Sequence, residues 1–143
     1  MNEGKERLRL LMRQKMNSSD DVLTGMVMGD FSRIESGARN LAFLSLQSEW
    51  AAVDTPEYMS FSQSFRSTAE EIADHANAKN MMSVEDAYAR MTRSCLDCHA
   101  YLRQQGLNDL PGATASIDVD RSWRLADATS MWSAQDENGV ASP

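Results

Sequence analysis

The chain has 143 residues, of which 24% are charged, and a formal net charge of −7. A chain of this length is typical of one domain of ordinary size. The acidic balance argues against a nucleic-acid-binding protein, which would present a basic face, and it favours a basic partner. Because the sequence has no run of 18 apolar residues and no basic segment followed by an apolar one, we expect neither a membrane span nor a signal peptide in it.

Two segments with helical periodicity fill roughly the first fifty residues. The first runs from about residue 3 to 28, and Gly29 ends it. Its expected core stripe follows a spacing of three to four residues through Leu8, Met12, Met16, Ser19, Leu23 and Met26. The second segment runs from about 30 to 52. It is apolar on more than one side, so it has more apolar surface than one core-facing stripe requires.

Two further segments follow. The third begins at Asp54-Thr55-Pro56-Glu57, where Thr can cap a helix and Pro suits its first position, and it continues to about residue 79. The fourth begins at Ser83, in a pattern that resembles a capping box, and ends at Gly106. Its apolar seam reads Val84, Tyr88, Met91, Cys95, Cys98 and Leu102. Four helices with short connections predict an all-α fold, an antiparallel up-down-up-down four-helix bundle.

The most specific pattern lies in the fourth segment, where Cys95-Leu96-Asp97-Cys98-His99 uses both cysteines of the chain. This is the attachment sequence of c-type haem, in which each thiol adds to a porphyrin vinyl group and the histidine ligates the iron. We therefore expect one covalent haem c, with its iron bound by His99. Because both thiols lie on the predicted core stripe, the haem should lie inside the bundle.

Other interpretations of the two cysteines stay open, namely a redox dithiol, part of a zinc site, or chance. A redox dithiol is typical of a βαβ context, and a structural zinc site needs two more ligands, whereas His75 is the one other histidine. The sequence offers no acid and base pair and no nucleophile with a base partner. We therefore do not expect an enzyme.

We assign residues 1–106 to the bundle and residues 107–143 to a C-terminal extension. The extension is expected to hold a short helix at about 121–132 and a loose end. Because thioether attachment of haem is normally completed outside the cytoplasm, we expect a periplasmic protein. Its signal peptide or anchor would have been removed upstream, or the chain is one domain of a longer protein.

A haem motif at the end of the fourth helix resembles the class II cytochromes c, the cytochrome c′ and cytochrome c556 family, over roughly residues 5–105. The matching pieces are the motif itself, Arg103 four residues after the histidine, and the stretch Met12-Arg13-Gln14. The resemblance implies that Arg103 lies along the proximal haem edge and that Arg13 reaches a propionate. The sequence departs from the family at Leu102, where an aromatic residue is usual. Family members commonly pair through their first two helices, so we expect a homodimer.

The side chain on the far side of the iron decides the function. In the family, an apolar residue there gives a five-coordinate, high-spin haem that binds NO or CO, whereas a methionine gives a six-coordinate, low-spin electron carrier. Met12 and Met16 both lie on the predicted stripe, and we choose Met12 because it precedes Gly29 by 17 residues, as the resemblance requires. We therefore expect a mono-haem electron carrier with a His99 and Met12 ligand pair and basic redox partners. A gas-binding cytochrome c′ and a haem module of a larger oxidoreductase are the alternatives.

Overall fold

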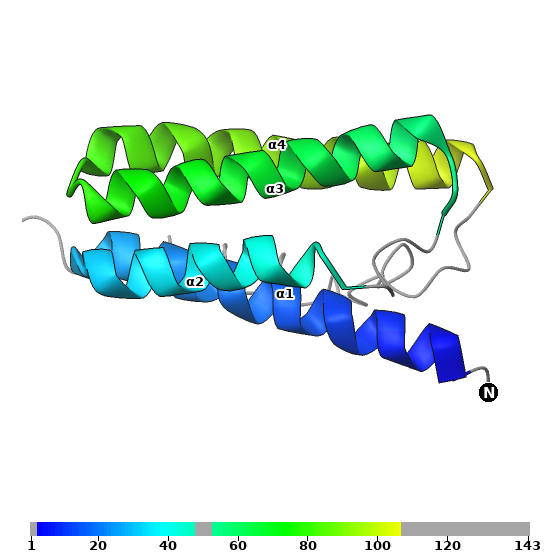
Figure 1. The fold of residues 1–143 in the computed structure, drawn as a ribbon, viewed down its shortest axis with the longest axis horizontal. Coiled ribbons are helices and arrows are strands. Elements are labelled where there is room, and N and C mark those ends of the chain that lie inside the picture. The colour runs from blue at the N-terminus through cyan, green and yellow to red at the C-terminus, as the bar shows by residue number, and fades with distance from the viewer. Residues whose placement is uncertain (1–2, 48–52, 107–143) are drawn as a thin grey trace, which may run out of the picture.

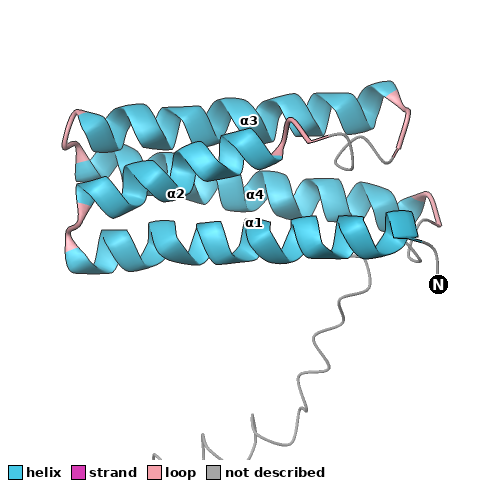
Figure 2. Cartoon of the chain, turned by 60° about the horizontal axis from the view of Figure 1, so that its bottom comes forward, coloured by secondary structure: helices cyan, strands magenta, loops and turns pink. Residues whose placement is uncertain are grey.

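The structure, a computed structural model, describes residues 3–47 and 53–106, which form four α-helices in an up-down-up-down bundle (Figures 1 and 2). The helices are α1 (Glu3–Met28), α2 (Phe31–Leu44), α3 (Pro56–Asn77) and α4 (Met81–Gln104). This part of the chain contains no strand, so the predicted all-α bundle is confirmed. The helix predicted at about 121–132 and the rest of the extension lie outside the described residues. No helix of the described segments is long and apolar enough to cross a membrane.

Local caps set several helix ends where the sequence predicts them. Gly29 ends α1 with a left-handed φ of +67°, and the Asp30 side chain then accepts a hydrogen bond from a backbone N–H in the first turn of α2. The Thr55 side chain caps α3 by accepting from the backbone N–H of Tyr58. Gly106 follows α4 with a φ of +69°. Glycine adopts this backbone conformation without the steric cost that other residues meet.

The second helix ends earlier than the sequence predicts, at Leu44 rather than near residue 52. Ser45 explains this end, because its hydroxyl donates a hydrogen bond to the carbonyl oxygen of Ala42 at 2.6 Å. The same hydroxyl accepts a hydrogen bond from Nε of Arg66, on α3, at 3.0 Å. The end of α2 therefore depends on a contact with another helix.

The fourth helix begins at Met81, earlier than the predicted start at Ser83. The Asn80 side chain accepts a hydrogen bond from the backbone N–H of Ser83, so Asn80 is the N-cap and Ser83 lies in the first turn. Asparagine is one of the strongest N-cap residues, and its oxygen satisfies a backbone N–H that would otherwise have no partner in the helix.

The core stripe of α1 differs from the predicted one by about one residue. Met16 is 66% exposed and Leu23 is 45% exposed, so the prediction that they face the core is wrong. Met12, Ser19 and Met26 are half-buried on the flank of the true stripe. That stripe consists of Leu8, Leu11, Lys15, Ser18, Val22 and Gly25. Three of its six members are not apolar side chains, which is why a search for apolar periodicity selected other positions.

Two glycines allow α1 and α2 to pack closely. A Cβ atom on Gly25 would lie 2.8 Å from Cγ1 of Ile34. A Cβ atom on Gly37 would lie 3.0 Å from the carbonyl oxygen of Ser18 and 3.0 Å from Cγ2 of Val22. These distances are shorter than ordinary contacts between carbon atoms, so side chains at these positions would push the two helices apart.

The apolar seam of α4 is the predicted one, since its members are buried or pack against the core. The helix α4 forms a distinctive pair with α1. The backbones of consecutive helices approach closely, whereas those of α1 and α4 come near each other at few points. Side chains from α1 and α4 therefore occupy the space between these two helices. The predicted haem motif lies on α4, near the C-terminal end of that helix.

Candidate functional site

The two thiols of α4 lie one helical turn apart. Cys95 and Cys98 are free, half-buried cysteines that pack against the hydrophobic core, as the predicted stripe requires. Burial raises the pKa of the Cys98 thiol, while the positive charge of Lys15 acts in the opposite direction. Two unoxidised sulfur atoms on the core side of one helix can add to the two vinyl groups of a single porphyrin.

His99 follows Cys98 directly and is also half-buried. Burial lowers the pKa of its imidazole below the ordinary value, and the positive charges of Lys15 and Arg103 lower it further. All three causes favour the neutral ring, which is the form that ligates iron. The chemistry of these donors therefore fits a covalently attached haem with an imidazole ligand.

A contact between α1 and α4 shows which residues of the two helices lie at the same level. The hydroxyl of Ser19 on α1 lies 3.3 Å from the hydroxyl of Tyr88 on α4. Met12 precedes Ser19 by seven residues and Cys95 follows Tyr88 by seven residues. Because seven residues make about two turns and the helices are antiparallel, Met12 and Cys95 lie at the same level on facing sides.

The two candidate methionines therefore differ in position. Met12 is half-buried and packs against the core on the side of α1 that faces α4. Met16, at 66% exposure, points away from the interior. Of the two, Met12 is the one whose thioether lies on the motif side of α1. Its role as an iron ligand stays a prediction.

Lys15 is a site residue that the sequence patterns missed. Its side chain is 9% exposed, and its Nζ lies 4.0 Å from the centre of the Phe65 ring on α3. It lies close enough to Cys95, Cys98 and His99 to act on them electrostatically. Burial lowers the pKa of Lys15, and the two cysteines oppose that change. A charged residue gives no apolar signal, so the predicted stripe passed through Met12 and Met16, and only the structure locates Lys15 on the buried side of α1.

Tyr101, two residues after His99, is a second residue near the motif that the sequence patterns missed. The hydroxyl of Tyr101 lies 2.8 Å from that of Thr55, and its ring centre lies 5.6 Å from that of Phe61. Tyr58 is buried one turn before Phe61, and burial together with the negative charge of Cys98 raises its pKa to about 12. These aromatic side chains therefore join α3 to the part of α4 that carries the motif.

The two arginines assigned by resemblance are on the surface. Arg13 is exposed on α1, whereas Lys15 is the cation of that helix that lies beside the motif. Arg103 is exposed on α4 but remains near enough to His99 to lower its pKa. Arg103 therefore lies near His99, the predicted iron ligand. The haem contacts predicted for Arg13 and Arg103 stay predictions.

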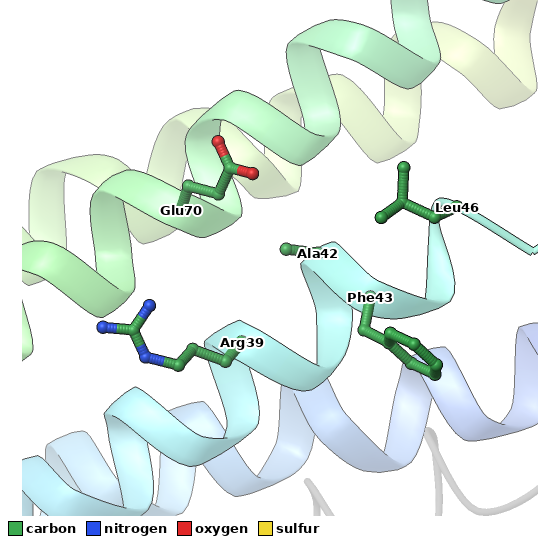
Figure 3. Close-up of a pocket in the computed structure, with 5 residues that line it drawn as sticks. All are labelled: Arg39, Ala42, Phe43, Leu46 and Glu70. Atoms are coloured by element: carbon green, nitrogen blue, oxygen red, sulfur yellow. The ribbon is translucent and has the colours of Figure 1, made fainter.

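A separate hollow lies on the surface between α2 and α3 (Figure 3). It is lined by Arg39, Ala42, Phe43, Leu46 and Glu70, none of which belongs to the predicted haem site. Phe43 and Leu46 are 60% and 62% exposed, so the apolar excess predicted for the second helix lies on the molecular surface.

Comparison of the chain with protein families, with curated proteins and with solved structures finds no match. The assignment of a function therefore rests on the motif and on the contacts described above.

Proposed function

We propose that this protein is a mono-haem c-type cytochrome that carries electrons. One observation carries the proposal. The free thiols of Cys95 and Cys98 lie together on the core side of α4, and the half-buried imidazole of His99 follows them. This combination of two thiols and one imidazole is the donor set that covalent haem attachment uses.

Each side chain has a distinct role in the proposal. Cys95 and Cys98 would form thioethers to the haem, and His99 would ligate its iron. Met12 would supply a thioether sulfur as the second protein ligand, because it lies on the face of α1 that is level with Cys95. The haem supplies reversible one-electron chemistry. The two helices would hold His99 and Met12 in place, so that little has to move when the electron arrives.

The electron-carrier proposal is favoured over the gas-binding alternative by the position of Met12. A thioether opposite a histidine raises the reduction potential relative to a pair of histidines, and it closes the iron to small ligands. A five-coordinate cytochrome c′ would follow if an apolar residue took that place. A haem module of a larger oxidoreductase would use the same site residues. That alternative differs from an electron carrier only in the protein domain attached to this one.

The surroundings of the protein follow from the same proposal. Thioether attachment places it in the periplasm, and a net charge of −7 favours a redox partner with a basic docking face. Phe43 on α2 and Leu46 just after it are exposed and offer apolar area for the proposed homodimer. Light scattering at tens of micromolar tests the dimer, and a monomer at that concentration would contradict it.

The test of the main proposal is the intact mass of the denatured protein produced in cells that can mature cytochromes c. We expect the polypeptide mass plus one haem, and loss of stable attachment in a Cys95→Ser and Cys98→Ser double variant. An absorption spectrum of the reduced protein with and without CO then separates an electron carrier from a gas-binding cytochrome c′. An electron carrier leaves the spectrum unchanged, whereas the gas-binding alternative takes up CO. A mass equal to the polypeptide alone would refute the proposal.

A further inference from the structure

Lys15 carries a positive charge into the bundle at the level of the motif. Its Nζ lies 4.0 Å from the centre of the Phe65 ring, so the side chain reaches from α1 to α3. The contact of Ser19 with Tyr88 sets Met12 level with Cys95, so Lys15, three residues after Met12, lies within one helical turn of that level. Its positive charge also acts on the imidazole of His99. One cationic side chain therefore lies among three helices, beside the three residues assigned to the haem.

This placement is unusual for lysine. Lysine is among the residues least often buried, because an ammonium group loses its hydration when it leaves water. The face of the Phe65 ring compensates part of this loss through a cation–π contact. The arginines at positions 7, 9 and 13 of the same helix are all exposed. A stripe position that only filled the core would hold an apolar residue such as Leu11, one turn earlier.

We propose that Lys15 raises the reduction potential of the haem by placing a positive charge inside the bundle beside Cys95, Cys98 and His99. The inference rests on the proposed function. Oxidised iron carries one more positive charge than reduced iron, so a fixed cation nearby disfavours the oxidised state. Burial strengthens this effect. Dissolved salt screens charges at the protein surface, and it screens a charge inside the protein much less.

The burial of Lys15 and the reduction of the iron are coupled through the same electrostatics. Burial lowers the pKa of Lys15, which means that its charge is held at an energetic cost. Reduction removes one positive charge from the site, so it makes the lysine charge less costly. Lys15 thus acts as a charge that favours the reduced protein, and Met12 remains the proposed ligand.

The experiment compares midpoint potentials of the holoprotein by optical redox titration. The variants Lys15→Gln and Lys15→Leu remove the charge without adding a group that can ligate iron, and Lys15→Arg retains a charge. The matched control is Arg9→Gln, which removes an exposed cation of the same helix that pairs with Glu6 at 3.4 Å. Two neutral variants are used so that one remains if the other folds poorly.

We expect both neutral variants to bind haem covalently, to keep a low-spin spectrum and to have a lower midpoint potential than the unmodified protein. Lys15→Arg should stay nearer to the unmodified value, and Arg9→Gln should shift it much less than the neutral Lys15 variants do. An unchanged potential in Lys15→Gln and Lys15→Leu would overturn the inference, as would an equal shift in Arg9→Gln.

Two further outcomes are distinguishable. If Lys15→Leu loses the low-spin spectrum, the lysine amine itself ligates the iron, and the electrostatic role is wrong. If denaturing mass spectrometry finds no haem on the unmodified protein, the proposed function fails, and this inference fails with it.

Discussion

The hydroxyl of Thr55 lies 2.8 Å from the hydroxyl of Tyr101, and this contact joins the cap of α3 to the last turns of α4. The Tyr101 ring also lies against the Phe61 ring, with the two ring planes inclined at 49°. Tyr101 follows His99 by two residues. The contacts of Tyr101 therefore hold the end of the helix segment that carries the motif.

The variant Tyr101→Phe tests the hydroxyl separately from the ring. It keeps the contact with Phe61 and removes the hydrogen bond to Thr55, so we expect the free energy of unfolding to fall by about 1 kcal/mol. Tyr101→Ala also removes the ring contact, and we expect a loss of about 3 kcal/mol. Urea denaturation measures both. Equal losses in the two variants would show that the ring contributes nothing.

A second prediction concerns the close packing of α1 and α2. Gly37→Ala would place a methyl group 3.0 Å from the carbonyl oxygen of Ser18 and from Cγ2 of Val22. Alanine is the better helix former by about 1 kcal/mol, but overpacking costs about 1–3 kcal/mol, so we expect a net loss of stability. The neighbouring exposed position offers a control, since Ser36→Ala should change stability by less than about 0.5 kcal/mol. A Gly37→Ala variant more stable than the unmodified protein would contradict the close approach.

The helix ends divide into those that the sequence could predict and those that it could not. Two of these ends are set by the backbone conformation of a glycine, Gly29 or Gly106, and a third is set by the side chain of Thr55. Each residue acts on the backbone next to it, so the local sequence predicts the helix end. The end of α2 depends instead on the hydrogen bond from Arg66 to Ser45, which joins two helices. A pattern within one segment carries no information about such a contact.

The candidate site divides in the same way. The motif is a local pattern, and its two half-buried thiols lie on the predicted side of α4. The register of α1 was not predictable from apolar spacing, because Lys15 and Ser18 occupy buried positions while Met16 is exposed. The contact of Thr55 with Tyr101 joins residues 46 positions apart in the sequence. Only the packing of the helices brings such residues together.

A third prediction follows from the buried hydroxyl of Tyr58. Burial is the main cause that raises its pKa to about 12 from an ordinary value of 10.0, and the charge of Cys98 adds to this only where that thiol is free. Between these values the folded protein keeps a proton that the unfolded chain has lost. This contribution to stability is therefore complete below pH 10.0 and is lost as the pH rises towards about 12. Its size is about 2 kcal/mol.

Comparison with Tyr58→Phe isolates this contribution. Lys15 acts in the opposite direction, because its lowered pKa means that stability is gained as the pH rises towards the ordinary lysine value. Because both proteins contain Lys15, subtracting their free energies of unfolding cancels its effect. We expect unfolding free energies to decline less steeply in Tyr58→Phe between about pH 9 and pH 11.5. Parallel declines would show that Tyr58 ionises as easily in the folded protein as in the unfolded chain.

The last prediction separates the two methionines of α1. Met12 lies on the side of α1 that faces Cys95, whereas Met16 is 66% exposed. Met12→Ala should lose the sulfur-to-iron charge-transfer band of the oxidised protein, become high-spin, bind CO and have a lower potential. Met16→Ala is the matched control, because it removes the same side chain one turn away. It should keep the band, and its cost in stability should be below about 0.5 kcal/mol, as for other exposed positions.

If Met16→Ala abolishes the band and Met12→Ala keeps it, the ligand assignment is wrong by one turn, although the protein remains an electron carrier. If the unmodified protein is already high-spin and binds CO, neither methionine ligates the iron, and the gas-binding alternative replaces the proposal.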